Sequence, residues 1–201
     1  MMQGSPEWFA IRCGRATASR FSDVMAKIKT GEAAGRRNYR AQLVCERLTG
    51  VPAESYINAA MQWGIDTEPL ARVAYEALSG NIVEQIAFVT HPELMAGASP
   101  DGLIDLDGGL ECKCPNTAQH IDALLKGMPP EHIPQIQGGM WLTDRQWWDF
   151  VSFDPRMPEK LQLYVQRVPR DDAYIANLEK KVRLFLAEVD DLVAQLERKA
   201  A

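Results

Sequence analysis

Apolar residues recur at helical spacing near both ends of the chain and in strand-like runs through its middle. Helices are predicted where apolar positions repeat every three or four residues and a capping residue or glycine marks an end. The helical ranges are 6–12, a short helix capped by Thr17 or Ser19, 37–48, 59–78, 117–126, 133–142 and a long helix from 172. Strands are predicted at 81–84, 85–90, 95–99, 146–153 and 161–168, with a hairpin among them. This order indicates an α/β (α+β) fold, and without linkers or repeats we expect one domain over residues 1–201.

Two of the predicted helices carry apolar stripes that we expect to be buried. In the helix over 59–78 the stripe comprises Met61, Ile65, Leu70, Val73, Ala74 and Leu78. In the C-terminal helix, where it serves core packing or a subunit contact, it comprises Ile175, Leu178, Val182, Phe185, Leu186, Val189, Leu192, Val193 and Leu196. Pro69 removes a backbone donor within the first of these helices, so two helices meeting near Thr67 are an alternative.

The segment 99–115, SPDGLIDLDGGLECKCP, combines turn residues with two strand-like runs. The apolar residues after Asp101 and the turn Asp107-Gly108-Gly109 predict a hairpin whose second strand folds back beside the first. Alternate side chains of a strand face opposite sides, so Glu111 and Lys113 share one face. Asp101 then lies near the end of the hairpin, within reach of Glu111.

This spacing is typical of metal-assisted hydrolysis of a phosphodiester. Carboxylate oxygens are ligands for Mg²⁺, and a neighbouring ammonium can orient a water and favour its deprotonation. Each half of the pattern is common without catalysis, since Pro-Asp-Gly is usually a structural turn and Glu-x-Lys is frequent on exposed strands. Together, Pro100-Asp101 and Glu111-x-Lys113 resemble the PD-(D/E)xK nuclease motif. Asp105 and Asp107 are interpreted as solvated hairpin carboxylates.

The composition is that of an ordinary globular protein, because 46% of the 201 residues are hydrophobic and 24% are charged. No apolar run reaches the length of a membrane span and the first residues lack a signal-peptide layout, so we expect a cytoplasmic protein without membrane contact. The four cysteines form no C-x-x-C pair and are expected to be reduced, with Cys112 and Cys114 buried on the strand face opposite the acids. His91, His120 and His132 are interpreted as loop or capping residues rather than zinc ligands.

The net charge of −5 conceals a basic N-terminal quarter. Residues 1–50 carry nine Lys or Arg against four Asp or Glu, whereas the rest of the chain carries thirteen against twenty-three. Phosphate binding needs a local positive field rather than a positive total. Composition alone leaves two interpretations open, a phosphate-binding patch or a solvated basic face.

Five sequence blocks, in order, resemble the lambda-type phage exonucleases, also called YqaJ-like viral recombinases. The blocks are Trp8-x-x-x-Arg12-x-Gly14 with Thr17-Ala18-Ser19, Trp63-Gly64-x-x-x-Glu68, Ser99-Pro100-Asp101-Gly102-Leu103, Leu110-Glu111-x-Lys113-Cys114-Pro115, and Gln135-x-Gln137 with Met140-Trp141. Asp154-Pro155-Arg156-Met157 extends the match beyond them. The resemblance covers nearly the whole chain and implies a PD-(D/E)xK, restriction-endonuclease-like core in which helices flank a mixed central sheet.

The resemblance also implies an activity. Enzymes of this family degrade double-stranded DNA processively from 5′ ends and leave 3′ single-stranded overhangs for recombination. They assemble as a ring-shaped homotrimer that threads the DNA and work beside a single-strand annealing protein. The implied cofactor is Mg²⁺, with Mn²⁺ as a substitute and two ions per active site.

By position, the resemblance assigns the metal ligands and the group that acts on the attacking water. Asp101, Glu111, Glu68 and the backbone carbonyl of Cys112 would bind metal. Lys113 would position the water and help to deprotonate it, and a lysine beside cations is expected to have a lowered pKa, which favours activity at alkaline pH. If the family resemblance is set aside, the simplest interpretation of Glu68 is an ordinary helix-surface carboxylate.

The resemblance assigns two further groups. Gln135 would hydrogen-bond a water or phosphate at the active site, although the same residue alone is an ordinary helix-surface glutamine. Arg12 and Ser19 would bind the terminal 5′ phosphate, with Arg15 and Arg20 contributing to the same patch. Without the family, a surface salt bridge is the simpler role for Arg12.

Two other functions remain open at this point. One is a DNA endonuclease of the same superfamily, with structure or sequence specificity. The other is a non-catalytic protein that binds DNA ends. An enzyme that requires ends leaves closed circular DNA intact, and a binding protein cleaves neither form.

Overall fold

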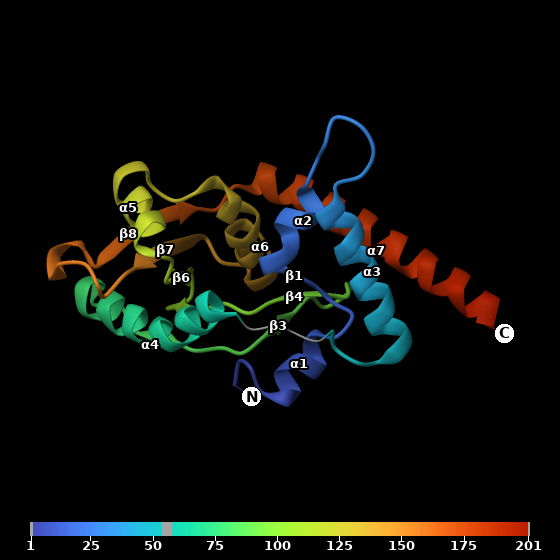
Figure 1. Cartoon of the computed structure of the whole chain (residues 1–201), viewed down its shortest axis with the longest axis horizontal. Coiled ribbons are helices and arrows are strands. Elements are labelled where there is room, and N and C mark those ends of the chain that lie inside the picture. Colours follow the sequence, from blue (N-terminus) through green and yellow to red (C-terminus); the bar gives the residue numbers. More distant parts are fainter. Residues whose placement is uncertain (1, 54–57, 201) are drawn as a thin grey trace.

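The computed structural model describes residues 2–53 and 58–200, which form helices and strands (Figure 1). The α-helices are α1 (Pro6–Arg12), α2 (Phe21–Met25), α3 (Ala34–Thr49), α4 (Ala59–Ser79), α5 (Thr117–Lys126), α6 (Ile133–Thr143) and α7 (Asp172–Ala200). The strands are β1 (Ala16–Thr17), β2 (Val83–Glu84), β3 (Val89–Thr90), β4 (Ala96–Ala98), β5 (Gly102–Ile104), β6 (Gly108–Lys113), β7 (Trp147–Phe153) and β8 (Leu163–Pro169). Short 3₁₀ turns are η1 (Ala18–Arg20), η2 (Pro130–His132) and η3 (Glu159–Leu161).

Local capping explains why several predicted helix ends are correct. The Ser5 side chain accepts a hydrogen bond from the Trp8 amide at the start of α1, and Asn116 caps α5 in the same way. Gly80 ends α4 in a left-handed conformation at φ 73°, which glycine adopts without strain. These signals lie within a few residues of the helix they delimit, so they are readable from sequence.

The strands form two mixed sheets, ordered β2-β5-β6-β7-β8 and β1-β4-β3. In the larger sheet β6 and β7 are parallel and the other neighbouring pairs are antiparallel. A parallel pair needs a crossover connection, which α5 and α6 provide. The register sets Glu111 beside Phe150 and Lys113 beside Ser152.

Helices cover both faces of the larger sheet (Figure 1). On one face Ala71 and Tyr75 of α4 pack against strand residues that include Leu110 and Cys112. On the other face Ile136 and Met140 of α6 pack against strand residues that include Phe150. Glu111 of β6 therefore lies on the α6 side, while the buried thiol of Cys112 lies on the α4 side as predicted.

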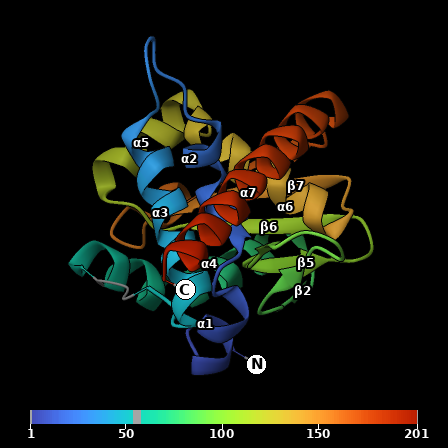
Figure 2. The same ribbon diagram turned by 90° about the vertical axis from the view of Figure 1, so that its right-hand side faces the viewer.

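The C-terminal helix α7 crosses the N-terminal helices and extends past them (Figures 1 and 2). Its predicted stripe is buried from Ile175 to Val189, where it packs with residues of α2 and α3. Leu192 and Val193 are partly buried, and Leu196 is 42% exposed. The core-packing interpretation of this stripe is confirmed except at its last position.

The predicted buried stripe of the helix over 59–78 is wrong. The exposed members of that stripe are Met61, Ile65, Leu70, Val73 and Leu78, and the buried residues of α4 are instead Thr67, Ala71 and Tyr75. The Tyr75 hydroxyl donates to Asp149 Oδ2 at 2.7 Å, so the polar atom of this buried face is satisfied. The face of α4 that packs against the sheet is the one that also carries Glu68. Hydrophobic periodicity could not show which face of the helix this would be.

Pro69 lies inside one continuous helix, so the two-helix alternative is also wrong. Pro69 is exposed, and the missing backbone donor leaves a carbonyl that solvent can satisfy.

The predicted second helix is shorter than expected and begins differently. Ala16–Thr17 pairs with β4 as strand β1, and η1 leads into the five-residue α2. Thr17 makes no side-chain cap, and Ile28 beyond the helix is 53% exposed. Pairing with β4 is a long-range interaction, and it replaces the helical cap that the local sequence suggested.

No helix within residues 2–53 and 58–200 is long and apolar enough to cross a membrane.

Candidate active site

Asp101 lies at the open end of the β5–β6 hairpin, as predicted. The register pairs Gly102 with Leu110, so Asp101 comes beside Glu111. Its Oδ2 atom accepts a hydrogen bond from the backbone N–H of Cys112 at 2.7 Å. At the opposite end, Asp105 and Asp107 are exposed, in agreement with their interpretation as solvated carboxylates.

Glu111, Lys113 and Gln135 form a hydrogen-bonded group on the α6 side of the sheet. The Lys113 ammonium donates to Glu111 Oε1 at 2.6 Å and to Gln135 Oε1 at 3.4 Å. The Gln135 amide donates to the same Glu111 oxygen. The Glu111 side chain is 5% exposed and that of Lys113 is 31% exposed. Gln135 therefore contacts the predicted catalytic pair and is not an ordinary surface glutamine.

Glu68 approaches this group from α4. Burial raises its pKa, Arg72 opposes that shift, and the nearby Glu111 adds to it. Glu68 and Glu111 line the same cavity, although they belong to different elements. The structure thus brings Glu68 to the site, as the family resemblance implied.

The three acids repel one another. Burial, Glu111 and Glu68 all raise the pKa of Asp101 well above its usual range. Carboxylates that share a small volume favour either a proton or a bound cation. The side-chain atoms of these acids that could bind a metal are all oxygen atoms, which suits a hard cation such as Mg²⁺.

The carboxylates fit a metal in chemistry, but each is engaged with protein atoms in this structure. Across the described ranges, no three His, Cys, Asp or Glu side chains gather in an arrangement ready to hold a metal. Asp101 bonds the Cys112 amide, Glu111 bonds Lys113, and Glu68 lies 3.4 Å from Arg72. Metal binding therefore requires side-chain rearrangement.

The expected lowering of the Lys113 pKa is not found in this arrangement. Burial lowers the pKa of Lys113, but the charges of Glu111 and Asp101 outweigh it and raise the pKa to about 12. Carboxylates, rather than cations, surround the ammonium. Lys113 is consequently protonated at neutral pH and acts as a hydrogen-bond donor.

Arg12 is held beside the acids by an aromatic ring and a hydroxyl group. Its guanidinium stacks on Trp8 with 4.0 Å to the ring centroid and donates to Ser99 Oγ at 2.9 Å. The Trp8 indole N–H donates to the same Ser99 oxygen at 2.9 Å. Burial lowers the pKa of Arg12, and no carboxylate of the described residues lies within ion-pair distance. The charge of Glu46 opposes the shift from a distance, but no carboxylate contacts this partly buried cation, so the site favours binding of an anion.

A cavity of about 240 Å³ joins Arg12 to the acids. Its lining includes Arg12, Ser19, Glu68, Asp101, Glu111, Lys113 and Gln135. A second cavity of about 910 Å³ shares Glu68 and Lys113 with the first and continues past Met128, His132 and Phe150. Glu68 and Lys113 thus lie where the two cavities border one another, whereas Asp101 and Glu111 line the smaller cavity.

Two of the predicted phosphate-binding residues are placed elsewhere. Arg15 donates from Nε to the carbonyl of Ile11 at 2.9 Å and does not line the smaller cavity. Arg20 pairs with Asp23 at 2.6 Å. Both assignments rested on proximity in sequence, and neither Arg15 nor Arg20 lines the smaller cavity.

Trp8 and Ser99 are partners of Arg12 that were not predicted from the sequence. Trp8 and Arg12 are four residues apart on α1, a spacing that places side chains next to each other on a helix. The stack was therefore open to prediction from sequence. The contact with Ser99 was not, because it joins α1 to the turn that precedes Asp101.

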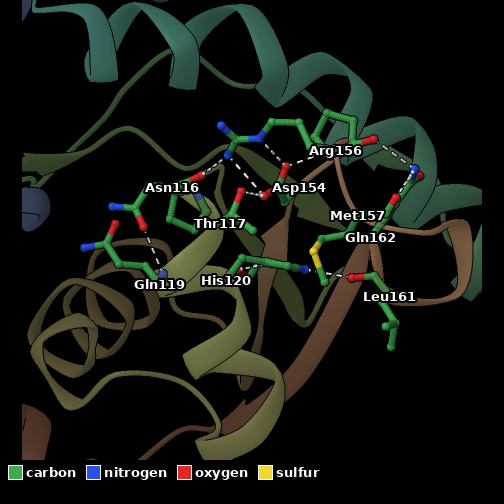
Figure 3. A network of polar contacts seen from close by, with 12 residues as sticks. Asn116, Thr117, Gln119, His120, Asp154, Arg156, Met157, Leu161 and Gln162 are labelled. Carbon is green, nitrogen blue, oxygen red and sulfur yellow. Dashed lines mark hydrogen bonds and ion pairs between the residues drawn. The ribbon is translucent and has the colours of Figure 1, made fainter.

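A polar network secures the chain just beyond Lys113 (Figure 3). Asp154 accepts hydrogen bonds from Arg156 and from the hydroxyl of Thr117, the first residue of α5. Arg156 also donates to the carbonyl of Pro115 at 3.2 Å and stacks on Trp63 of α4 at 4.4 Å. The Asp154-Pro155-Arg156-Met157 block thereby ties the end of β6 to the helix that carries Glu68.

The predicted positions of the histidines are partly wrong. His91 accepts hydrogen bonds from the amides of Glu93 and Leu94, which agrees with a capping role. His120 is fully buried within α5 and bonds Ser152 and the Leu161 carbonyl (Figure 3). Its burial depends on the packing of α5 against β7, which is a long-range contact.

Comparison with known proteins identifies the family. Residues 7–146 match the YqaJ-like viral recombinase domain. The uncharacterised protein ExoD of Escherichia coli (strain K12) is 31% identical over 65 residues, which span 32% of this chain and 74% of ExoD.

Solved structures agree with this match. The crystal structure of the alkaline exonuclease LHK-Exo from Laribacter hongkongensis is 48% identical, covers 98% of each chain and has a TM-score of 0.91. A phage-related exonuclease from Haemophilus somnus 129PT is 16% identical, covers 90% of this chain and 96% of its own, and with a TM-score of 0.74 shows the same fold. The expected α/β core of the PD-(D/E)xK type is therefore confirmed. The match covers most of the chain, and the protein belongs to the YqaJ-like viral recombinase domain family.

Proposed function

We propose that this protein is a Mg²⁺-dependent deoxyribonuclease that degrades double-stranded DNA from 5′ ends and leaves 3′ single-stranded overhangs. The observation that carries the proposal is the single cavity lined by both Arg12 and the acids. An enzyme that removes nucleotides from a 5′ end must hold the terminal phosphate near the group that hydrolyses the next phosphodiester. Arg12 offers the first function and the acid cluster offers the second.

The similar proteins support this activity. LHK-Exo is an alkaline exonuclease, and one of its crystal structures contains dAMP. A deoxynucleoside monophosphate has the chemistry of the product that an exonuclease releases. The chain is 48% identical to LHK-Exo across nearly its whole length, so a shared reaction is the simplest account.

Asp101, Glu111 and Glu68 would hold the metal, with the backbone carbonyl of Cys112 adding an oxygen ligand. We propose two Mg²⁺ ions per site, with Mn²⁺ as a substitute. When bound, the cations supply positive charge that stabilises the negative charge developing on the phosphate oxygens. The raised pKa of Asp101, caused by burial and by the charges of Glu111 and Glu68, supports this assignment, because a bound cation offsets both effects.

Lys113 and Gln135 would position the attacking water. Both already hydrogen-bond Glu111, and both line the cavity. A protonated Lys113 donates to the water and favours its deprotonated form through its positive charge. Gln135 accepts and donates without adding charge, so it can orient either the water or a phosphate oxygen.

Arg12 and Ser19 would bind the 5′ phosphate. The Arg12 guanidinium is preorganised by Trp8 and Ser99, and it can offer a fork of donors to phosphate oxygens. Ser19 is an exposed hydroxyl on the wall of the same cavity. This pocket would give the enzyme a preference for phosphorylated 5′ ends.

We further propose, from the family resemblance, a homotrimeric ring around DNA and cooperation with a single-strand annealing protein in the cytoplasm. Light scattering of the purified protein tests the trimer directly. A monomer in solution would contradict it.

Linear duplex DNA with a 5′ phosphate on one strand tests the proposed function. We expect Mg²⁺-dependent loss of the phosphorylated strand, no loss with chelator or with Lys113→Ala, and no cleavage of a covalently closed circle. A cut circle would indicate an endonuclease. Binding of ends without cleavage of either substrate would indicate a DNA-end-binding protein.

A further inference from the structure

The Arg72 side chain lies beside the acid cluster and has no role in the mechanism above. It projects from α4 one turn after Glu68 and is 13% exposed. Its Nη1 atom donates to Glu68 Oε1 at 3.4 Å and to the backbone carbonyl of Asp101 at 3.3 Å. With the Gln85 amide oxygen turned toward the guanidinium, that oxygen accepts from Nη1 at 3.0 Å and from Nη2 at 2.8 Å.

These contacts join three separate segments of the chain. Glu68 is on α4, Asp101 is on the turn before β5, and Gln85 follows β2. The β-ladder determines the path of the turn that carries Asp101, whereas Glu68 depends on how α4 packs against the sheet through side chains. Arg72 lies between α4 and the turn before β5 and contacts both.

Arginine suits this position because of its shape as well as its charge. A planar guanidinium carries five N–H donors at fixed angles and can bond several acceptors at once. A lysine ammonium retains the charge but acts as a point donor on a flexible stem. The two residues therefore differ in geometry while the net charge of the site stays the same.

We propose that Arg72 is a positioning residue that sets the Glu68 carboxylate and the Asp101 turn relative to each other, so that both can serve the same cation site. The inference rests on the proposed function, since it takes Glu68 and Asp101 as metal ligands. Groups that orient metal ligands influence both affinity and rate, because a small displacement of a ligand weakens every contact it makes.

Arg72→Lys and Arg72→Gln test this role, with Gln85→Ala as a milder change in an exposed residue. The readouts are the affinity of the DNA-free protein for Mn²⁺ by calorimetry, the kcat and KM for linear DNA ends, and the Tm. Arg183→Lys is the matched control, because Arg183 forms the same i,i+4 pair with Glu179 on an exposed part of α7.

Both Arg72 variants should lose about tenfold in Mn²⁺ affinity and in kcat, whereas KM for DNA ends stays near the wild-type value. Gln85→Ala should shift Mn²⁺ affinity in the same direction by a smaller factor, and it decides the question if the Arg72 variants fail to fold. Arg183→Lys should match the wild type in every readout.

The Lys variant separates geometry from charge. If Arg72→Lys has wild-type Mn²⁺ affinity and kcat, charge alone suffices and the inference is overturned. A fall in Tm with unchanged Mn²⁺ affinity in the variants also overturns it, because Arg72 would then serve only the fold. A wild-type protein that binds no Mn²⁺ and cleaves no DNA overturns the proposed function and this inference together.

Discussion

Replacing Asp154 with asparagine removes a buried charge that four hydrogen bonds hold in place (Figure 3). Oδ1 accepts from the Arg156 backbone amide at 3.0 Å and from its Nε at 2.7 Å. Oδ2 accepts from Thr117 Oγ1 at 2.7 Å and from Arg156 Nη2 at 3.0 Å. The Asp154 side chain is 0% exposed, so water cannot replace a lost partner. An asparagine amide would turn N–H groups toward donors that now meet an anion.

The pKa of Asp154 gives the size of its contribution to the free energy of unfolding. Burial raises this pKa, but the hydrogen bonds from Arg156 and Thr117 outweigh it and lower the pKa to about 2, against an ordinary value of 3.8. That difference corresponds to about 2 kcal/mol of unfolding free energy at neutral pH. Because the folded pKa is lowered, this stability is present above the unfolded pKa near 3.8 and is lost as the pH falls toward 2.

Urea unfolding followed by tryptophan fluorescence at pH 7, 5 and 3 measures the effect. Asp154→Asn should be less stable than the wild type by about 2 kcal/mol at pH 7 and 5, and by about half as much at pH 3. Asp122→Asn is the control, since its exposed pair with Lys126 on α5 should contribute little. A deficit that stays constant down to pH 3, or no deficit at pH 7, would refute the reasoning from charge.

Three further predictions concern the site. Lys113→Ala should abolish cleavage but keep DNA binding and Mn²⁺ binding, whereas Glu111→Ala should weaken Mn²⁺ binding as well; near wild-type cutting by Lys113→Ala in a gel assay would reject the role of the ammonium. Arg12→Ala should reduce the preference for 5′-phosphorylated over 5′-hydroxyl ends by about tenfold, and an unchanged ratio of kcat/KM values would place the phosphate pocket elsewhere. Burial and the Lys113 charge lower the pKa of His132 to about 4, below its ordinary 6.5, so stability should fall as the pH drops from 6.5 toward 4. Urea unfolding at pH 7.5 and 5 measures this loss of stability, which should be roughly 1 kcal/mol in the wild type after solvent screening and absent in His132→Gln. If His132→Gln loses as much stability as the wild type, other groups cause the loss.

The β5–β6 hairpin could be predicted from sequence because its determinants are local. Turn residues and alternating apolar positions lie within 99–115, and they place Asp101 near Glu111 without reference to the rest of the chain. The same holds for helix ends at Ser5, Asn116 and Gly80, where a cap acts on its own helix.

The family blocks also carried Glu68, Gln135 and Arg12 to the site, although spacing alone did not. These residues come from α4, α6 and α1, and their meeting depends on how each helix packs against the sheet. Hydrophobic periodicity reports that a helix has an apolar face, but it does not report which face meets a particular partner. In α4 it indicated the wrong one, because the buried face is chosen by Tyr75 and its bond to Asp149.

By itself, the sequence determined the hairpin with its acids and lysine, the helix ends at Ser5, Asn116 and Gly80, and most of the order of elements, since each depends on neighbouring residues and short-range backbone geometry. Only the tertiary structure decided the raised pKa of Lys113, the cavity shared by Arg12 and the acids, and the position of Arg72 between Glu68 and Asp101. Charge interactions and cavities arise from groups brought together through space. Their strength depends on burial and distance, which no local pattern specifies.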